Sequence, residues 1–248
     1  MIYICIPAYN EERTIGVVLW KTREVMADFE RDYEVLVVDD GSTDGTWDVI
    51  APYTRIMPVH VRRHEKREGY AASLEALVRE AASRAPYPKR DVIVTLQADF
   101  TDEPEDVALL VKRIEGGADV VTGRVHLMAE ETPRVLRWSR KAWHYVLRRV
   151  HGGQEEGDIL SGFRAYRVVA LLRAMEEAGQ GALLTTDGWA ANAELLRRVA
   201  PHSRRTEAVD VHLRYGRLQR ESRFRPVQAS RDLVRLLRPR TGTAGRSA

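Results

Sequence analysis

Short apolar segments alternate with amphipathic segments over the first 125 residues, and this alternation limits the possible folds more than any other feature. Apolar runs predict five buried strands, at 2–6, 33–38, 56–61, 91–96 and 118–122. Amphipathic stretches predict helices between them, at 11–29, 47–53, 70–85 and 105–115. The strands look apolar on both faces, as strands covered by helices on two sides are. The sequence therefore predicts a three-layer α/β/α fold with a mostly parallel central sheet.

Three of the predicted strands run directly into polar, turn-rich loops. PAYNE follows the first strand, DDGSTD the second and QADFTDEPED the fourth. In parallel sheets, ligands bind beyond the carboxyl ends of the strands. We therefore expect these three loops to meet at one edge of the sheet and form the functional site.

Charge is unevenly distributed along the chain. The net charge is only +3, but the segment from Arg197 to the end has fourteen arginines against four acidic residues. Residues 134–150 form a predicted amphipathic helix with six basic residues and no acidic one. This indicates an anionic partner such as a phosphate group or a membrane surface, unless the arginines only solvate the surface. The chain has no recognised nucleic-acid motif, so we expect no nucleic-acid partner.

No apolar run approaches the ~18 residues that a membrane-spanning helix needs. The first residues lead into a strand pattern without a basic region, so we expect no signal peptide. Cys5, the single cysteine, lies in that strand and is predicted to be a buried thiol. We expect a cytoplasmic protein, with peripheral contact at the inner face of the membrane through the basic helix at 134–150.

Five stretches together resemble a known family. In chain order they are IPAYNEERTI, VLVVDDGSTDGT, LQADFTDEP, DILSGFRAYR and RLQRESR. They resemble the family 2 glycosyltransferases, especially the polyprenyl-phosphate branch that includes dolichyl-phosphate mannose synthases. The resemblance covers roughly residues 1–225 and implies a GT-A (Rossmann-like) domain there. Beyond it we expect a basic helix at 226–240 and a disordered tail at 241–248.

The family resemblance implies an inverting, metal-dependent transferase with a GDP- or UDP-linked sugar donor. It assigns donor contacts to Pro7, Tyr9, Glu11, Val38, Asp40, Arg67, Gln97, Ala98, Asp99, Arg124, Arg217 and Arg223. Tyr9 would pack against the base, and Arg67 would reach the diphosphate unless it is a solvated surface residue. The alternatives are structural: Asn10 would cap a strand-to-helix turn, and Asp39 would only shape the DDGS turn.

The stretch at 97–99 matches the family's Asp-any-Asp metal motif with one departure. Asp99 is the expected ligand of Mg²⁺ or Mn²⁺, while Gln97 replaces the first aspartate and offers an oxygen without charge. Asp102 is a candidate for the missing charge. The later acids Glu103, Glu105 and Asp106 are expected to serve the start of the next helix, where negative charge is favourable.

Acceptor contacts are also implied by the resemblance. Ser161 and Arg164 would meet the acceptor phosphate, with a structural turn as the alternative, and Ser222 belongs to the late RLQRESR segment. In that segment Arg217 and Arg223 keep the spacing of the family's two cations and would close over the diphosphate. Asp187 would act as general base if the acceptor is a hydroxyl, or it would cap the helix that follows.

These observations favour an inverting glycosyltransferase with a polyprenyl-phosphate acceptor. Two alternatives remain open from the sequence: transfer to a soluble or saccharide hydroxyl with Asp187 as base, and a non-catalytic nucleotide-sugar-binding protein. Gln97 supports the second alternative, because it removes a charge from the expected metal site.

Overall fold

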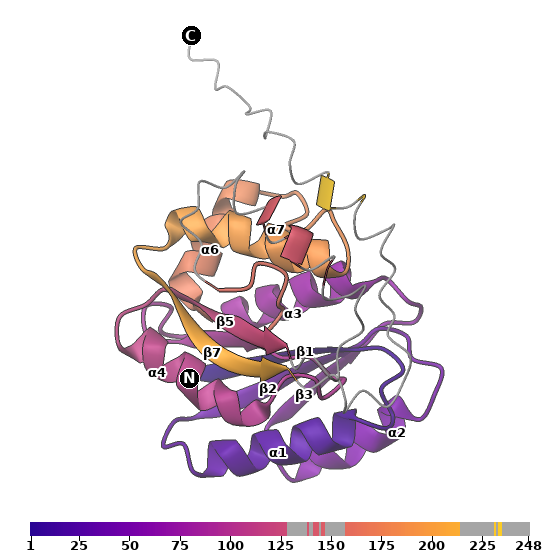
Figure 1. The fold of residues 1–248 in the computed structure, drawn as a ribbon. Helices are drawn as coiled ribbons and strands as arrows, with labels where there is room; N and C mark the ends of the chain where they lie inside the picture. Colours follow the sequence, from indigo (N-terminus) through magenta and orange to yellow (C-terminus); the bar gives the residue numbers. More distant parts are fainter. Residues whose placement is uncertain are drawn as a thin grey trace.

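A seven-stranded sheet forms the centre of the residues that the computed structural model describes, namely 1–127, 138, 141–143, 145–146, 157–213, 231 and 233–234 (Figure 1). The strands are β1 (Ile2–Ala8), β2 (Tyr33–Asp39), β3 (Val59–Arg63), β4 (Val92–Thr95), β5 (Val120–Leu127), β6 (Arg164–Arg167) and β7 (Thr206–Leu213). The helices are α1 (Ile15–Ala27), α2 (Thr46–Ile50), α3 (Tyr70–Arg84), α4 (Val107–Glu115), α6 (Val168–Ala178) and α7 (Trp189–Val199). Short 3₁₀ helices cover Ala51–Arg55, Pro104–Asp106 and Ala200–His202.

The sheet is parallel except for one strand, which confirms the predicted fold class. Its order is β3-β2-β1-β4-β6-β5-β7. β1 pairs in parallel with β2 and β4, and β6 runs antiparallel to both β4 and β5. The carboxyl ends of β1, β2 and β4 therefore lie at the same edge of the sheet, where their three polar loops begin.

Alternating side chains of β1 supply two separate cores. Ile2, Ile4 and Ile6 are buried in one core with residues of α1 and α4. Tyr3 and Cys5 are buried in the other core with residues of α3, α6 and α7. Figure 1 shows the same three layers, with α1 and α2 on one side of the sheet and α3, α6 and α7 on the other. Burial raises the pKa of the Cys5 thiol, as expected of a structural cysteine.

The structure differs from the sequence prediction mainly after the fifth strand. β6, α6 and β7 were not predicted, and β6 has only four residues. The predicted helix at 47–53 divides into α2 and a 3₁₀ turn, so β3 begins at Val59 rather than at residue 56. The predicted helix at 226–240 lies outside the described residues apart from positions 231, 233 and 234, and the tail at 241–248 lies outside them entirely.

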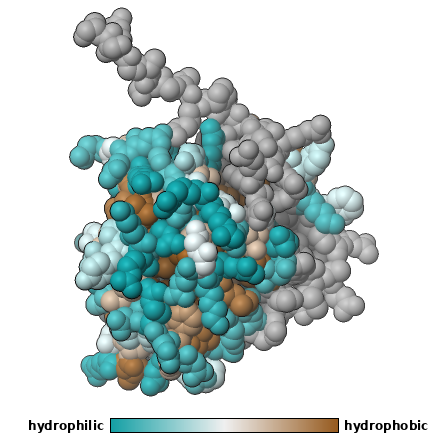
Figure 2. All heavy atoms as spheres, turned by 90° about the vertical axis from the view of Figure 1, so that its left-hand side faces the viewer, coloured by the Kyte–Doolittle hydropathy of each residue, from teal (hydrophilic) through white to brown (hydrophobic). Residues whose placement is uncertain are grey.

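The surface has exposed apolar side chains, but they are scattered. The face shown in Figure 2 is mostly hydrophilic, with hydrophobic residues in small separate groups. Single exposed residues such as Leu109 on α4 are ordinary for a globular protein. Within the described segments, no helix combines the length and the hydropathy that crossing a bilayer requires.

Two positions on α1 test the layered core. Leu19 is fully buried beneath the sheet, whereas Val17 on the same helix is 40% exposed. Leu19→Ala should lower the free energy of unfolding by about 2–5 kcal/mol, because it leaves a cavity. Val17→Ala should change the free energy by less than about 0.5 kcal/mol. Urea unfolding measures both, and equal effects would contradict the described packing of α1.

Candidate active site

The loops after β1 and β2 are joined by reciprocal hydrogen bonds. Asp40 N donates to Ala8 O at 2.8 Å, and Asn10 N donates to Ser42 Oγ at 2.9 Å. In return, Thr43 N donates to the side-chain oxygen of Asn10 at 2.8 Å. Asn10 thus joins the loops instead of capping a helix, and its left-handed φ of 50° fits asparagine.

Glu11 lies in the same joint and is almost completely buried. Its backbone N–H donates to Thr46 Oγ1 at 2.8 Å, and its Oε2 accepts from Thr14 Oγ1 at 3.2 Å. The predicted contact residues Pro7 and Val38 are register partners on β1 and β2. The structure therefore brings Pro7, Glu11 and Val38 together at one edge of the sheet.

The two aspartates of DDGS have different tasks. Asp39 is fully buried, and its Oδ1 accepts from Ser42 N at 3.0 Å, which confirms the predicted turn. Asp40 reaches across to the loop before α3. Its Oδ1 accepts from Glu68 N at 2.8 Å and lies 2.9 Å from His64 Nδ1, while its Oδ2 accepts from Gly69 N at 2.9 Å. The Asp40 carboxylate thereby fixes the start of α3 against the end of β2.

Tyr9 and Arg67, both predicted to bind the nucleotide, contact each other. The Arg67 guanidinium lies 4.3 Å from the centre of the Tyr9 ring, in a cation–π arrangement. Arg67 Nε is also 4.0 Å from Asp40 Oδ2, and the arginine side chain remains 57% exposed. This places the expected base platform, the expected diphosphate ligand and Asp40 in one cluster.

The loop after β4 holds Asp99 in a tight turn. Asp99 Oδ1 accepts from Thr101 N at 3.1 Å and from Thr101 Oγ1 at 2.7 Å. Phe100, inside this turn, has a φ of 59°, which is strained for a bulky side chain. Gln97 N donates to the buried carboxylate of Asp102 at 3.1 Å, which closes the loop. Asp102 is thus a loop-closing residue, while Gln97, Ala98 and Asp99 occupy the strand end.

Two of the three later acids behave as predicted, whereas Glu103 is buried before the helix and its side chain does not cap it. Glu105 and Asp106 lie in the first turn of the 3₁₀ helix that leads into α4, with Pro104 at its start. Glu105 also forms an ion pair with Lys21 on α1. These residues therefore stabilise the beginning of a helix and its contact with a neighbouring helix.

This loop also determines whether a divalent cation fits. In the described part of the chain, no three His, Cys, Asp or Glu side chains form a group that could hold a metal by themselves. A Mg²⁺ or Mn²⁺ ion bound together with substrate phosphates needs only one or two carboxylates. The Asp99 carboxylate and the Gln97 amide oxygen therefore fit a cation whose remaining ligands come from a diphosphate.

The SGFR turn before β6 is built into the protein interior. Ser161 Oγ accepts from Phe163 N at 3.2 Å, and Thr95 Oγ1 donates to the carbonyl of Gly162. A side chain on Gly162 would collide with the Tyr70 hydroxyl, which lies only 2.9 Å from the point that a Cβ atom would occupy. The turn therefore depends on glycine to approach the start of α3.

Arg164 requires a correction of the sequence prediction. Its side chain is 1% exposed, and its guanidinium donates to the main-chain carbonyls of Asp158, Ile159 and Asn192. In this arrangement the guanidinium offers no surface to an acceptor phosphate. Arg164 instead ties the turn to α7, which agrees with the structural alternative for this motif.

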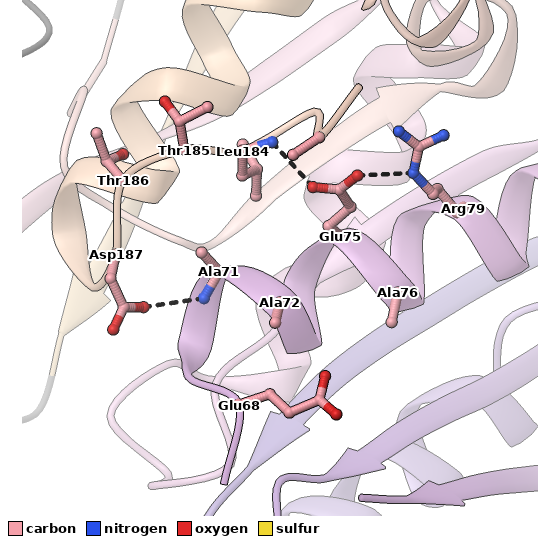
Figure 3. A pocket seen from close by; sticks show the side chains of 11 residues that line it. Glu68, Ala71, Ala72, Glu75, Ala76, Arg79, Leu184, Thr185, Thr186 and Asp187 are labelled. Carbon is pink, nitrogen blue, oxygen red and sulfur yellow. Dashed lines mark hydrogen bonds and ion pairs between the residues drawn. The ribbon is translucent and has the colours of Figure 1, made fainter. Parts of the chain in front are cut away.

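Asp187 also caps a helix, but not the one that was predicted. Its Oδ1 accepts from Ala71 N at 3.0 Å, in the first turn of α3, whereas Gly188 occupies the N-cap of α7. Figure 3 shows Asp187 at one end of a groove of about 630 Å³ between α3 and residues 182–187. Three acidic side chains, Glu68, Glu75 and Asp187, line this groove with Arg79.

The remaining predicted residues lie apart or outside the described chain. Arg124 on β5 forms an ion pair with Asp210 on β7 at 3.1 Å, in the other half of the sheet. Arg217, Ser222 and Arg223 lie outside the described residues. The sequence interpretation missed His64 and Asn192, although Asn192 and Glu194 are polar residues on an otherwise apolar face of α7, which is a usable signal.

A model of one protein family, described as glycosyl transferase family 2, matches residues 3–173. The chain belongs to this family. It is 27% identical over 186 residues to an undecaprenyl-phosphate 4-deoxy-4-formamido-L-arabinose transferase of Serratia proteamaculans, covering 71% of this chain and 52% of that protein. The enzyme of the same name from Pectobacterium atrosepticum is 28% identical over 182 residues, with the same two coverages. The chain thus spans about half the length of these curated relatives.

Solved structures support the family fold. Glucosyl-3-phosphoglycerate synthase from Mycobacterium tuberculosis, in complex with UDP, matches with a TM-score of 0.64 at 22% identity, covering 96% of this chain and 78% of that one. The same enzyme with Mn²⁺, UDP-glucose and phosphoglyceric acid gives a TM-score of 0.63, with the same identity and coverages. S. aureus TarS 1–349 gives a TM-score of 0.55 at 16% identity, covering 86% and 60%. The predicted GT-A fold is thereby confirmed.

Asp40→Asn tests the contact between β2 and the start of α3. The amide nitrogen would face backbone N–H groups that now meet a carboxylate oxygen, so the free energy of unfolding should fall by about 1–3 kcal/mol. Glu65→Gln, an exposed change in the same loop, should be nearly neutral. Denaturant unfolding compares them, and an unchanged Asp40→Asn variant would show that the three contacts contribute little.

Proposed function

We propose that this chain is an inverting glycosyltransferase that moves a sugar from a UDP-linked donor to a polyprenyl phosphate. The supporting observation is that the loops of Asp40 and Asp99 begin at the same edge of the sheet, where Asp40 also binds the start of α3. Family membership supports the transfer chemistry. The undecaprenyl-phosphate transferases among the relatives support a polyprenyl-phosphate acceptor. The UDP bound to a structural neighbour favours a UDP-linked donor over a GDP-linked one.

In this proposal the donor spans the three loops. Tyr9, Pro7, Val38 and Asp40 would contact the base and ribose. Arg67 would turn from the Tyr9 ring to the diphosphate, where a guanidinium forms charge-assisted hydrogen bonds. Glu11 and Ala98 would line the same donor site.

The leaving diphosphate would be held from two sides. Asp99 and Gln97 would bind a Mg²⁺ or Mn²⁺ ion, whose charge compensates the negative charge that develops on the leaving group. Arg217 and Arg223 would close over the diphosphate from the late segment, whereas Arg124, paired with Asp210 on β7, takes no part in this proposal. The acceptor attacks the anomeric carbon from the opposite side, which inverts its configuration. Ser222 would contact the acceptor, whereas the buried Ser161 serves the SGFR turn.

The proposed acceptor implies contact with a membrane surface. The predicted basic helix at 134–150 falls mostly outside the described residues, but Trp138 and Tyr145 within it are 70% and 61% exposed. Exposed aromatic side chains next to basic residues suit the interface of an anionic membrane. We infer peripheral binding at the cytoplasmic face.

A hydroxyl acceptor is the second candidate, and Asp187 supports it. The carboxylate lies at the end of the groove, and among the described residues only Ala71 N donates a hydrogen bond to it, through Oδ1. In this alternative, its Oδ2 would accept the proton of an attacking hydroxyl. A phosphate acceptor is already anionic and needs no base.

Asp99→Ala tests the donor site. The variant should lose the Mn²⁺-dependent part of UDP affinity, measured by calorimetry with and without EDTA. Transfer from UDP-sugars to a short polyprenyl phosphate should fall at least ~100-fold, because one stabiliser of the leaving group is removed. Glu105→Gln removes a charge from the same acidic stretch and should retain both properties. If Asp99→Ala leaves both UDP affinity and sugar transfer unchanged, the proposed metal site is refuted. If the wild-type protein forms no glycolipid with any common donor, the proposed reaction is refuted.

Asp187→Asn separates the two acceptor classes. With a hydroxyl-bearing saccharide acceptor, loss of the base should lower kcat by about 10²–10⁴-fold. With polyprenyl phosphate, kcat should change by less than about tenfold, because no proton has to be removed. Parallel assays with both acceptors decide between the classes, and a large loss with polyprenyl phosphate would contradict the first mechanism.

A further inference from the structure

The segment Leu183–Asp187, between α6 and α7, is held by an unusual set of contacts. Glu75 on α3 accepts from Leu183 N and Leu184 N, both at 2.9 Å. Glu194 on α7 accepts from the next two amides, Thr185 N at 2.8 Å and Thr186 N at 2.9 Å. Four consecutive main-chain amides are thus bound by carboxylates from two different helices.

Both carboxylates are themselves fixed. Arg79 donates to Glu75 at 2.8 Å and Arg198 donates to Glu194 at 2.9 Å, each one helical turn away. Glu194 also accepts the hydroxyls of Thr185 and Thr186, both at 2.9 Å.

These contacts keep both glutamates ionised. Burial alone would raise each pKa, but the amides and the arginine outweigh it, so the pKa of Glu75 and of Glu194 is lowered. The segment is therefore tied to two permanent charges at neutral pH.

The residue that follows these four amides is Asp187. Its carboxylate accepts from Ala71 N on α3, one turn before Glu75 on the same helix. Figure 3 shows Glu75 and Asp187 at separate points along the groove, with Leu184, Thr185 and Thr186 between them. The two glutamates thus fix the segment on the side of α3 and on the side of α7, which leaves little freedom to the side chain at its end.

Glu194 binds amides that lie outside its own helix. It lies in the middle of α7, so it is not a cap of its own helix, and the amides that it binds precede that helix. A carboxylate that only stabilised α7 would be satisfied by Arg198. Its buried oxygens are directed instead at the two residues before Asp187.

We propose that Glu75 and Glu194 are positioning residues that fix the Asp187 carboxylate at the start of α3 and thereby shape the acceptor side of the site. This inference rests on the proposed transferase function. It assigns no contact with substrate to either glutamate, because both act through the segment that they hold.

Amide hydrogen exchange of the resting protein tests the structural part without any assay of activity. Glu194→Gln should speed exchange at Thr185 and Thr186 and also at Ala71, whose amide loses a fixed Asp187. Amides of β1 and β4 should keep their protection, which shows that the variant is folded. Glu176→Gln, an exposed change on α6, is the matched control. Faster exchange at Thr185 and Thr186 with an unchanged Ala71 would overturn the proposal.

Kinetics test the functional part. Glu194→Gln should lower kcat at least ~10-fold with a hydroxyl acceptor, or raise KM for a polyprenyl phosphate by a similar factor, as expected for the loss of a supporting contact. The Kd for UDP with Mn²⁺, measured by calorimetry, should stay within about twofold, because the donor loops are separate. Unchanged kinetics would overturn the positioning role. A loss of UDP affinity as large as the loss of kcat would also overturn it.

A hydroxyl pair gives an independent check. Thr186→Val removes the hydroxyl bond to Glu194 at nearly constant volume, whereas Thr186→Ser keeps it. The valine variant should follow Glu194→Gln in exchange and kinetics, and the serine variant should follow wild type. If the wild-type protein transfers no sugar at all, the proposed function fails, while the exchange at Ala71 still decides whether the glutamates fix Asp187.

Discussion

The rest of the site depends on the hydrogen bonds of the Asp40 carboxylate. One side chain at the end of β2 binds the imidazole of His64 and the amides of Glu68 and Gly69. It thereby fixes where α3 begins. The start of α3 is in turn the surface that Asp187, Asn192 and Gly162 meet from the other half of the chain. A buried carboxylate with several donors is a strong constraint, because each donor left without it would carry a desolvation penalty.

The first half of the fold was predictable because its signals are local. β1, β2 and β4 are apolar on both faces and end in turn residues, so the parallel sheet and the edge with the polar loops follow from short segments of sequence, whereas the edge strand β3 is partly exposed. The prediction that Asp39 shapes its own turn was confirmed for the same reason, since Ser42 is only three residues away. β6 escaped prediction because four residues carry too little pattern.

The second half depends on contacts that no local pattern reports. Glu75 binds amides more than 100 residues further along the chain, and Asp187 caps a helix 116 residues before it. Arg164 shows the difficulty most clearly. In the sequence, an arginine in a polar turn indicates a phosphate ligand, but burial and three carbonyl partners make it part of the scaffold. The sequence shows that position 164 carries a positive charge, but only the three-dimensional structure shows that main-chain carbonyls are its partners.

The Arg67 guanidinium on the Tyr9 ring has a consequence for selectivity. Anything that packs on that face of the ring must first displace the guanidinium, and the lost attraction of about 0.5–1 kcal/mol is subtracted from its binding free energy. A molecule that also carries phosphate groups gives the displaced cation a new partner and recovers the loss. A bare nucleoside does not. In the proposed donor site, the resting contact would thus favour phosphate-bearing molecules over bare nucleosides by about two- to fivefold.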